Sequence, residues 1–82
     1  MSDQLSFRIV VSHDRQNGVW FVVDSDIPGL NAEADSLDAL VEVVTDLAPE
    51  LIEANLDDWD RDMPEIPLCV QHLVNVKRAH AA

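Results

Sequence analysis

Apolar and polar residues alternate in two stretches near the N-terminus, and a period of two predicts β-strands. The stretches are residues 5–12 (LSFRIVVS) and 19–24 (VWFVVD). In the first stretch the side chains that share one face are Phe7, Ile9 and Val11. The pair Asn17-Gly18 between the stretches is a strong hairpin signal, because both residue types tolerate the backbone of a tight turn. We therefore expect an antiparallel hairpin.

A second tight turn follows within residues 25–30 (SDIPGL). Pro28 presets its own φ and Gly29 accepts a positive φ, which together favour a type II turn. Residues 31–34 then predict a short third strand. Three consecutive strands joined by such tight turns form a meander, so we expect each of them to run antiparallel to the one before.

From Leu37 onward the apolar period changes to 3.6, which predicts an amphipathic helix. Ser36 is a good N-cap for this helix. The predicted core-facing stripe consists of Leu37, Leu40, Val41, Val44, Leu47, Leu51 and Ile52. Pro49 lies inside the helix and removes one backbone hydrogen bond, so the helix is expected either to kink or to split near Ala48.

Residues 66–78 alternate again and predict a long last strand, after an acidic segment at residues 55–65. The predicted fold is α+β with the order β-β-β-α-β, an antiparallel sheet with one helix packed on one face. The last strand joins either beside the first strand or at the opposite edge, and the pattern leaves both places open. A length of 82 residues suits one domain, 1–82, with its core at about 5–78.

The face of the sheet that the helix leaves uncovered is predicted to carry Val10, Trp20 and Val22. Trp20 and Val22 share one face of their strand, and an apolar second face favours self-association. We therefore expect a homodimer or a higher homo-oligomer. The alternative is that these apolar side chains are scattered on the surface and have no partner.

The chain is strongly acidic, with 16 Asp and Glu against five Lys and Arg and a net charge of −11. This balance disfavours direct binding to nucleic acid, since contacts to phosphates require basic side chains. It suits a basic protein partner, although the same charge also keeps a small domain soluble. No apolar stretch approaches the length of a membrane span. The single cysteine, Cys69, is typical of a reducing compartment, so we expect a cytoplasmic protein.

Three segments, GVWFVVDSDIPGL, NAEADSL and DALVEVVTDL, follow one another in the order of the core of the HicB antitoxin superfamily. The closest matches are the turn at residues 26–29 (DIPG) and the helix start at residues 34–37 (ADSL). Over residues 5–55 the chain resembles a short HicB-like family of unassigned function. The resemblance implies a partial ribonuclease-H-like core without nuclease carboxylates. It also implies a role in neutralising HicA, a small basic RNA-cleaving toxin.

HicB antitoxins also carry a C-terminal DNA-binding module. About four residues remain after the last predicted strand, so we do not expect that module here.

The charge and the resemblance together predict a non-enzymatic protein-interaction module. It would cover a small basic RNA-targeting partner with its acidic helix face or with a sheet edge. The residues expected to steer that partner are Asp38, Glu42, Asp46, Glu50 and Glu53. Trp59 or Trp20 would supply a buried anchor. The alternatives are a stand-alone homo-oligomeric regulatory or structural protein, and a degenerate ribonuclease-H-like nuclease.

We expect no cofactor, metal or catalytic site. Asp58, Asp60 and Asp62 alternate as at the start of an EF-hand loop, but Met63 and Cys69 stand where that loop requires Gly and Glu. The carboxylates that could serve a nuclease are Asp14, Asp24, Asp26 and Glu33. The histidines, His13, His72 and His80, show no metal-ligand spacing.

Overall fold

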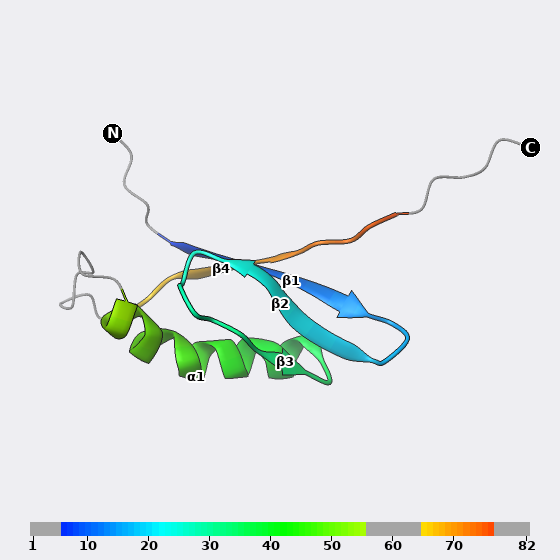
Figure 1. Ribbon diagram of the computed structural model, residues 1–82, viewed down its shortest axis with the longest axis horizontal. Coiled ribbons are helices and arrows are strands. Elements are labelled where there is room, and N and C mark those ends of the chain that lie inside the picture. The colour runs from blue at the N-terminus through cyan, green and yellow to red at the C-terminus, as the bar shows by residue number, and fades with distance from the viewer. Residues whose placement is uncertain (1–5, 56–64, 77–82) are drawn as a thin grey trace, which may run out of the picture.

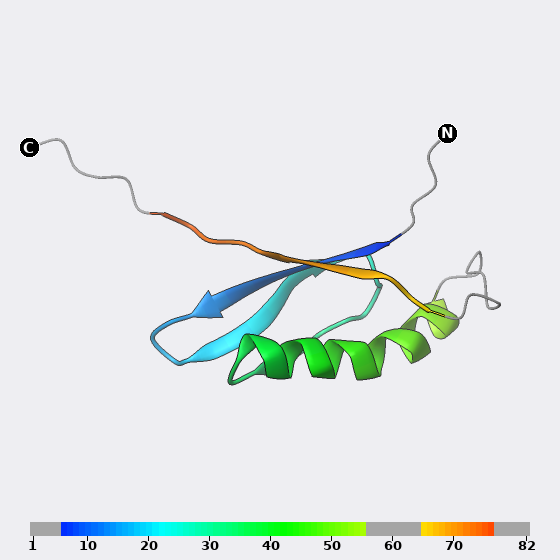
Figure 2. The ribbon, with the colours of Figure 1, turned by 180° about the vertical axis from the view of Figure 1, so that it is seen from behind.

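A computed structural model describes residues 6–55 and 65–76 of the chain. Its elements are β1 (Phe7–Asp14), β2 (Val19–Ser25), β3 (Glu33–Ala34), α1 (Leu37–Asn55) and β4 (Leu68–His72). The helix lies across one face of a four-stranded sheet (Figures 1 and 2). The predicted α+β fold and its β-β-β-α-β order are therefore confirmed. Trp59 and the alternating aspartates Asp58, Asp60 and Asp62 lie outside the described residues.

The strand order in the sheet is β3-β2-β1-β4. The first three strands pair antiparallel, as predicted, but β4 pairs parallel with β1, so the sheet is mixed. β3 runs in the same direction as β1, and a helix that crosses back over the sheet delivers the next strand in that same direction. Of the two places left open for the last strand, the structure shows the one beside the first strand.

The predicted turn and cap signals are present in the structure. Gly29 has a φ of +80°, and the Leu30 N–H donates to the Ile27 carbonyl at 3.4 Å, as expected for a type II turn. The Ala39 N–H donates to the Ser36 hydroxyl at 3.1 Å, which is an N-cap hydrogen bond. These local signals place α1 directly after the short strand β3.

Helix, turn and strand residues together form the core beneath the sheet. Its buried members are Ile9, Val11, Ile27, Leu30, Leu40, Val44, Ala48 and Ile52. The four helix residues follow a spacing of four, which lies on one helix face. The predicted helix stripe was wrong at Val41, which is 37% exposed, and it omitted Ala48, which is buried.

α1 is one helix of 19 residues that continues through Pro49. Of the two alternatives left open at Pro49, a kink or a split near Ala48, the structure therefore excludes the split. Ala48 and Ile52, on either side of Pro49, are both buried in the core. This tertiary packing holds the two halves in one helix, because packing rather than propensity supplies most helix stability in proteins.

The pairing of β1 with β2 corrects the predicted uncovered face. Val22 lies opposite Val11 and Trp20 lies opposite His13, so Trp20 and Val22 share the face of the buried Val11. Both side chains pack against the core. Only Val10 of the three predicted residues lies on the face that α1 leaves uncovered.

β4 is much shorter than the strand predicted at residues 66–78. The Leu73 N–H still donates to the Val11 carbonyl at 2.8 Å. The Leu73 carbonyl then accepts from the Ser12 hydroxyl at 3.2 Å, a side-chain bond in place of the next ladder bond. Beyond this point residues 74–76 run away from the sheet (Figures 1 and 2).

Candidate protein-interaction surface

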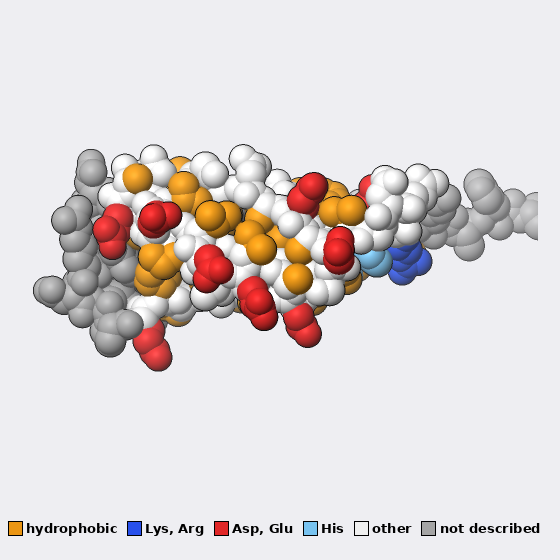
Figure 3. Space-filling view, turned by 90° about the horizontal axis from the view of Figure 1, so that it is seen from below, with side chains coloured by type: hydrophobic (Ala, Val, Ile, Leu, Met, Phe, Trp, Pro, Cys, Tyr) orange, Lys and Arg blue, Asp and Glu red, His pale blue; other side chains and the backbone are white. Residues whose placement is uncertain are grey.

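Five carboxylates form an acidic ridge on the outer face of α1: Asp38, Glu42, Asp46, Glu50 and Glu53. All five side chains are exposed. The first four recur every fourth residue, so they are successive neighbours along one helix face. Figure 3 shows acidic side chains gathered over the face of the molecule that α1 forms, with apolar side chains between them. The structure thus brings the predicted helix residues together on one surface.

The acidic ridge carries an unfavourable charge pattern for an isolated helix. Like charges at i and i+4 destabilise a helix by roughly 0.2–0.5 kcal/mol per pair, and the ridge contains such pairs in sequence. Glu50 and Glu53 also lie near the negative end of the helix dipole, where cations are favoured. α1 has no Lys or Arg to offset them. Among the described residues no ion pair neutralises the ridge.

Val41 adds an apolar contact at the margin of the acidic ridge. It lies between Asp38 and Thr45 on the helix surface and is 37% exposed. Protein interfaces combine apolar contacts with a charged rim, so Val41 and the ridge together have the composition of a docking surface. The apolar periodicity places Val41 in the core-facing stripe, so sequence reasoning did not identify it as an exposed residue.

Trp20, the alternative anchor, lies inside an aromatic cluster. Its ring stacks on His13 with centroids 4.4 Å apart and meets the His72 ring at 4.7 Å. Because Trp20 also packs against the core, its ring is largely occupied by contacts within the chain. Sequence reasoning missed this cluster, since only the strand register places His13 opposite Trp20.

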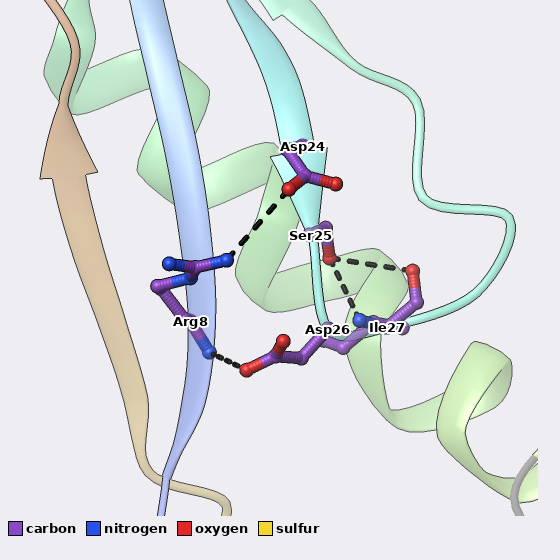
Figure 4. Close-up of polar contacts among 5 residues, drawn as sticks. All are labelled: Arg8, Asp24, Ser25, Asp26 and Ile27. Atoms are coloured by element: carbon purple, nitrogen blue, oxygen red, sulfur yellow. Dashed lines mark hydrogen bonds and ion pairs between the residues drawn. The ribbon is translucent and has the colours of Figure 1, made fainter.

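Two of the candidate nuclease carboxylates are engaged with Arg8 (Figure 4). Asp24 lies 3.7 Å from the Arg8 guanidinium. The Asp26 carboxylate accepts from the Arg8 N–H at 2.8 Å, and the Asp26 N–H donates to the Arg8 carbonyl at 2.9 Å. Asp26 thereby extends the pairing of the hairpin beyond the end of β2.

The hydroxyl of Ser25 orders the turn that follows (Figure 4). It accepts from the Ile27 N–H at 2.8 Å and donates to the Ile27 carbonyl at 3.3 Å. Ile27 is buried in the core, so this local turn fixes a core side chain.

Asp14 caps the hairpin loop between β1 and β2. Its carboxylate accepts from the side-chain amide of Asn17 at 2.8 Å and from the backbone N–H groups of Gln16 and Asn17 at 3.1 and 3.3 Å. These bonds, above all those from Asn17, lower the pKa of Asp14 below its ordinary value of 3.8. Glu33, the fourth candidate carboxylate, is exposed on β3.

The described residues contain no group of three or more His, Cys, Asp or Glu side chains placed to hold a metal ion. Their one helix, α1, is not long and apolar enough to cross a membrane. A hollow of about 620 Å³ lies between the hairpin loop and the chain that leaves β4. It is bordered by His13 and Asp14 on one side and by Leu73 and Val76 on the other.

A comparison with solved structures identifies one similar fold with known coordinates. The crystal structure of the hypothetical protein TTHA1013 from the extremely thermophilic bacterium Thermus thermophilus matches with a TM-score of 0.65 and 27% sequence identity. The match covers 87% of this chain and 99% of that chain. No curated protein matches the chain. The family of domains of unknown function DUF1902 matches residues 6–78, nearly the whole chain, and the protein therefore belongs to that family.

Proposed function

We propose that this protein is a non-enzymatic protein-interaction module whose acidic ridge binds a basic protein. The observation that carries the proposal is the unneutralised row of carboxylates along α1. Like charges at successive turns oppose folding, and a basic partner would relieve that repulsion when it binds. The exposed Val41 beside the ridge would add apolar contact area.

The chemistry of the ridge favours a protein over a nucleic acid as its ligand. Phosphates would be repelled by the ridge and by the net charge of −11. A protein that presents Lys and Arg would instead be steered toward it, with an association rate that falls as salt rises.

The resemblance to HicB antitoxins supports a more specific partner. It rests on the turn at residues 26–29 and on the helix start at residues 34–37, and the fold contains both features. We propose a small basic RNA-targeting protein of the HicA kind as the partner. Cys69 as the only cysteine suits a cytoplasmic location for the pair.

Capture from the native host tests this proposal. The tagged full chain should retain a small basic protein at low salt and release part of it at moderate salt, since exposed charge contacts are screened at higher ionic strength. Mass spectrometry of the eluate would identify it. If the chain retains no basic protein at either salt concentration, the proposal is wrong.

The same capture can be repeated with two variants that change the net charge equally. Glu42→Gln/Asp46→Asn/Glu50→Gln removes three charges from the ridge, and Glu33→Gln/Asp35→Asn/Glu65→Gln removes three exposed charges elsewhere. Each takes the net charge from −11 to −8. Retention should fall only with the ridge variant.

A further inference from the structure

We propose that the outer edge of β4 is a self-association site at which a second copy of this chain adds its own β4 antiparallel. β4 is the last strand of the sheet, with β1 as its single neighbour among the described residues. Its residues from Cys69 to His72 are all exposed. An edge of this kind presents unpaired backbone donors and acceptors that another strand can satisfy.

The hydrogen bonds to β1 show which backbone groups face outward. The Pro67 carbonyl and the Leu73 N–H both bond to β1, at 2.9 and 2.8 Å. Backbone groups alternate in direction along a strand, so those of Val70 and His72 point to the free edge. This edge lacks the usual protection against pairing, because no charged residue, proline or bulge interrupts β4.

The charge distribution argues for a second copy as the occupant. Residues 66–76 (IPLCVQHLVNV) contain no Asp, Glu, Lys or Arg, and this is the longest uncharged stretch in the chain. Two copies that each carry a charge of −11 repel one another over most of their surfaces. They can approach closely along this stretch, whereas it offers no charge to attract a basic protein.

The chain beyond β4 extends the same edge. Leu73, Val74 and Val76 are 43, 54 and 84% exposed, and the chain leaves the sheet after Leu73 (Figure 1). A hollow lies between this segment and the hairpin loop. Apolar side chains held in an extended segment would gain burial if an antiparallel copy lay alongside.

Sedimentation of the full chain over a range of concentrations tests the proposal. The native mass should rise from 9.1 kDa toward twice that value as concentration increases. Val70→Lys should keep the chain at 9.1 kDa, because a lysine on an edge strand opposes the pairing of a further strand and both copies would carry it. Val23→Lys makes the same change at an exposed residue of β2 and should leave the dimer intact. Circular dichroism of each variant checks that it is folded.

Two outcomes would overturn the proposal: a native chain that stays at 9.1 kDa throughout, or a dimer that Val23→Lys dissociates and Val70→Lys does not.

A cysteine scan locates the two-fold axis without relying on a disruptive change. In a Cys69→Ser background, single cysteines placed in turn along residues 68–73 are oxidised. One position near the axis should give the most disulfide-linked dimer, since a single residue opposes itself in an antiparallel pair. Equal or absent linkage at all positions contradicts strand pairing.

Discussion

Asp26 shows how one side chain can join a turn to a strand. Its carboxylate and its N–H bond both backbone groups of Arg8, and the adjacent Ser25 fixes the buried Ile27. The Asp-x-Pro-Gly pattern in the sequence indicated a turn correctly. It gave no sign of the bond to Arg8, because the partner lies 18 residues away.

Replacement of Asp26 should destabilise the fold measurably. Asp26→Ala leaves the Arg8 N–H without its charged acceptor and should lower the free energy of unfolding by about 1–2 kcal/mol. Asp26→Asn keeps an acceptor oxygen and should lower the free energy of unfolding by less. Urea unfolding followed by tryptophan fluorescence measures both. Equal losses for the two variants would show that the hydrogen bond is not what Asp26 contributes.

The hydrogen bonds to the Asp14 carboxylate predict how the stability of the fold changes at low pH. Its hydrogen bonds from Asn17 and Gln16 hold its pKa below 3.8 in the folded chain. Such a group stabilises the fold above the pKa of the unfolded chain, and that contribution is lost as pH falls through the lower, folded-state pKa. An NMR titration should find this pKa below 3.8. Asn17→Ala should return it toward 3.8, and a titration that the substitution leaves unchanged would contradict the assignment.

At the scale of elements, the sequence predicted the turns and the helix cap correctly, but it did not predict which strand residues share a face. The turn at Gly29 and the cap at Ser36 depend on neighbours in sequence and were predicted correctly. The face of Trp20 depends on register with β1, which alternation alone does not supply. A β-bulge adds to the difficulty, because Val10 pairs with Asp24 while Val11 pairs with Val22.

The bulge leaves Val23 as an extra residue without a partner on β1. One extra residue exchanges the faces of everything beyond it, since side chains alternate with a period of two. Asp24 therefore lies on the open face opposite Val10, where it reaches Arg8. Strict alternation would have placed Asp24 on the face of Trp20 and Val22, against the core.

Pro49 provides a test of why α1 remains one helix. Pro49→Ala restores the backbone donor for the Thr45 carbonyl and should raise the free energy of unfolding by about 1–3 kcal/mol. Pro28→Ala is the matched control, because Pro28 suits its turn and its loss should destabilise by about 0.4–1 kcal/mol. Urea unfolding of both variants measures the difference. A Pro49→Ala chain no more stable than the native one would contradict this explanation.

At the scale of the whole molecule, the composition gives the net charge, but only the fold shows where the charged side chains lie. Composition gives −11 without saying where the charge lies. The helix period predicted a row of carboxylates on α1, and the structure places them on an exposed face. The parallel place of β4 depends on the path of the chain over the sheet, so the uncharged edge was not predictable from local patterns.

These two surfaces divide the molecule by chemistry. The acidic ridge lies on the helix layer, and the uncharged edge belongs to the strand layer (Figures 1 and 3). A basic partner on the ridge and a second copy on β4 would use different elements and different forces. Salt should therefore weaken the first contact far more than the second, because the second rests on backbone pairing and apolar burial.

The acidic ridge is proposed to bind a basic protein. The most direct test is to measure, at low salt, the affinity of the captured partner for each of the two charge-matched variants. Isothermal titration calorimetry should find binding weakened at least tenfold by Glu42→Gln/Asp46→Asn/Glu50→Gln, about 1.4 kcal/mol. Glu33→Gln/Asp35→Asn/Glu65→Gln should bind nearly as the native chain does. Equal weakening by both variants would show that net charge alone drives binding, and no weakening by the ridge variant would place the contact elsewhere.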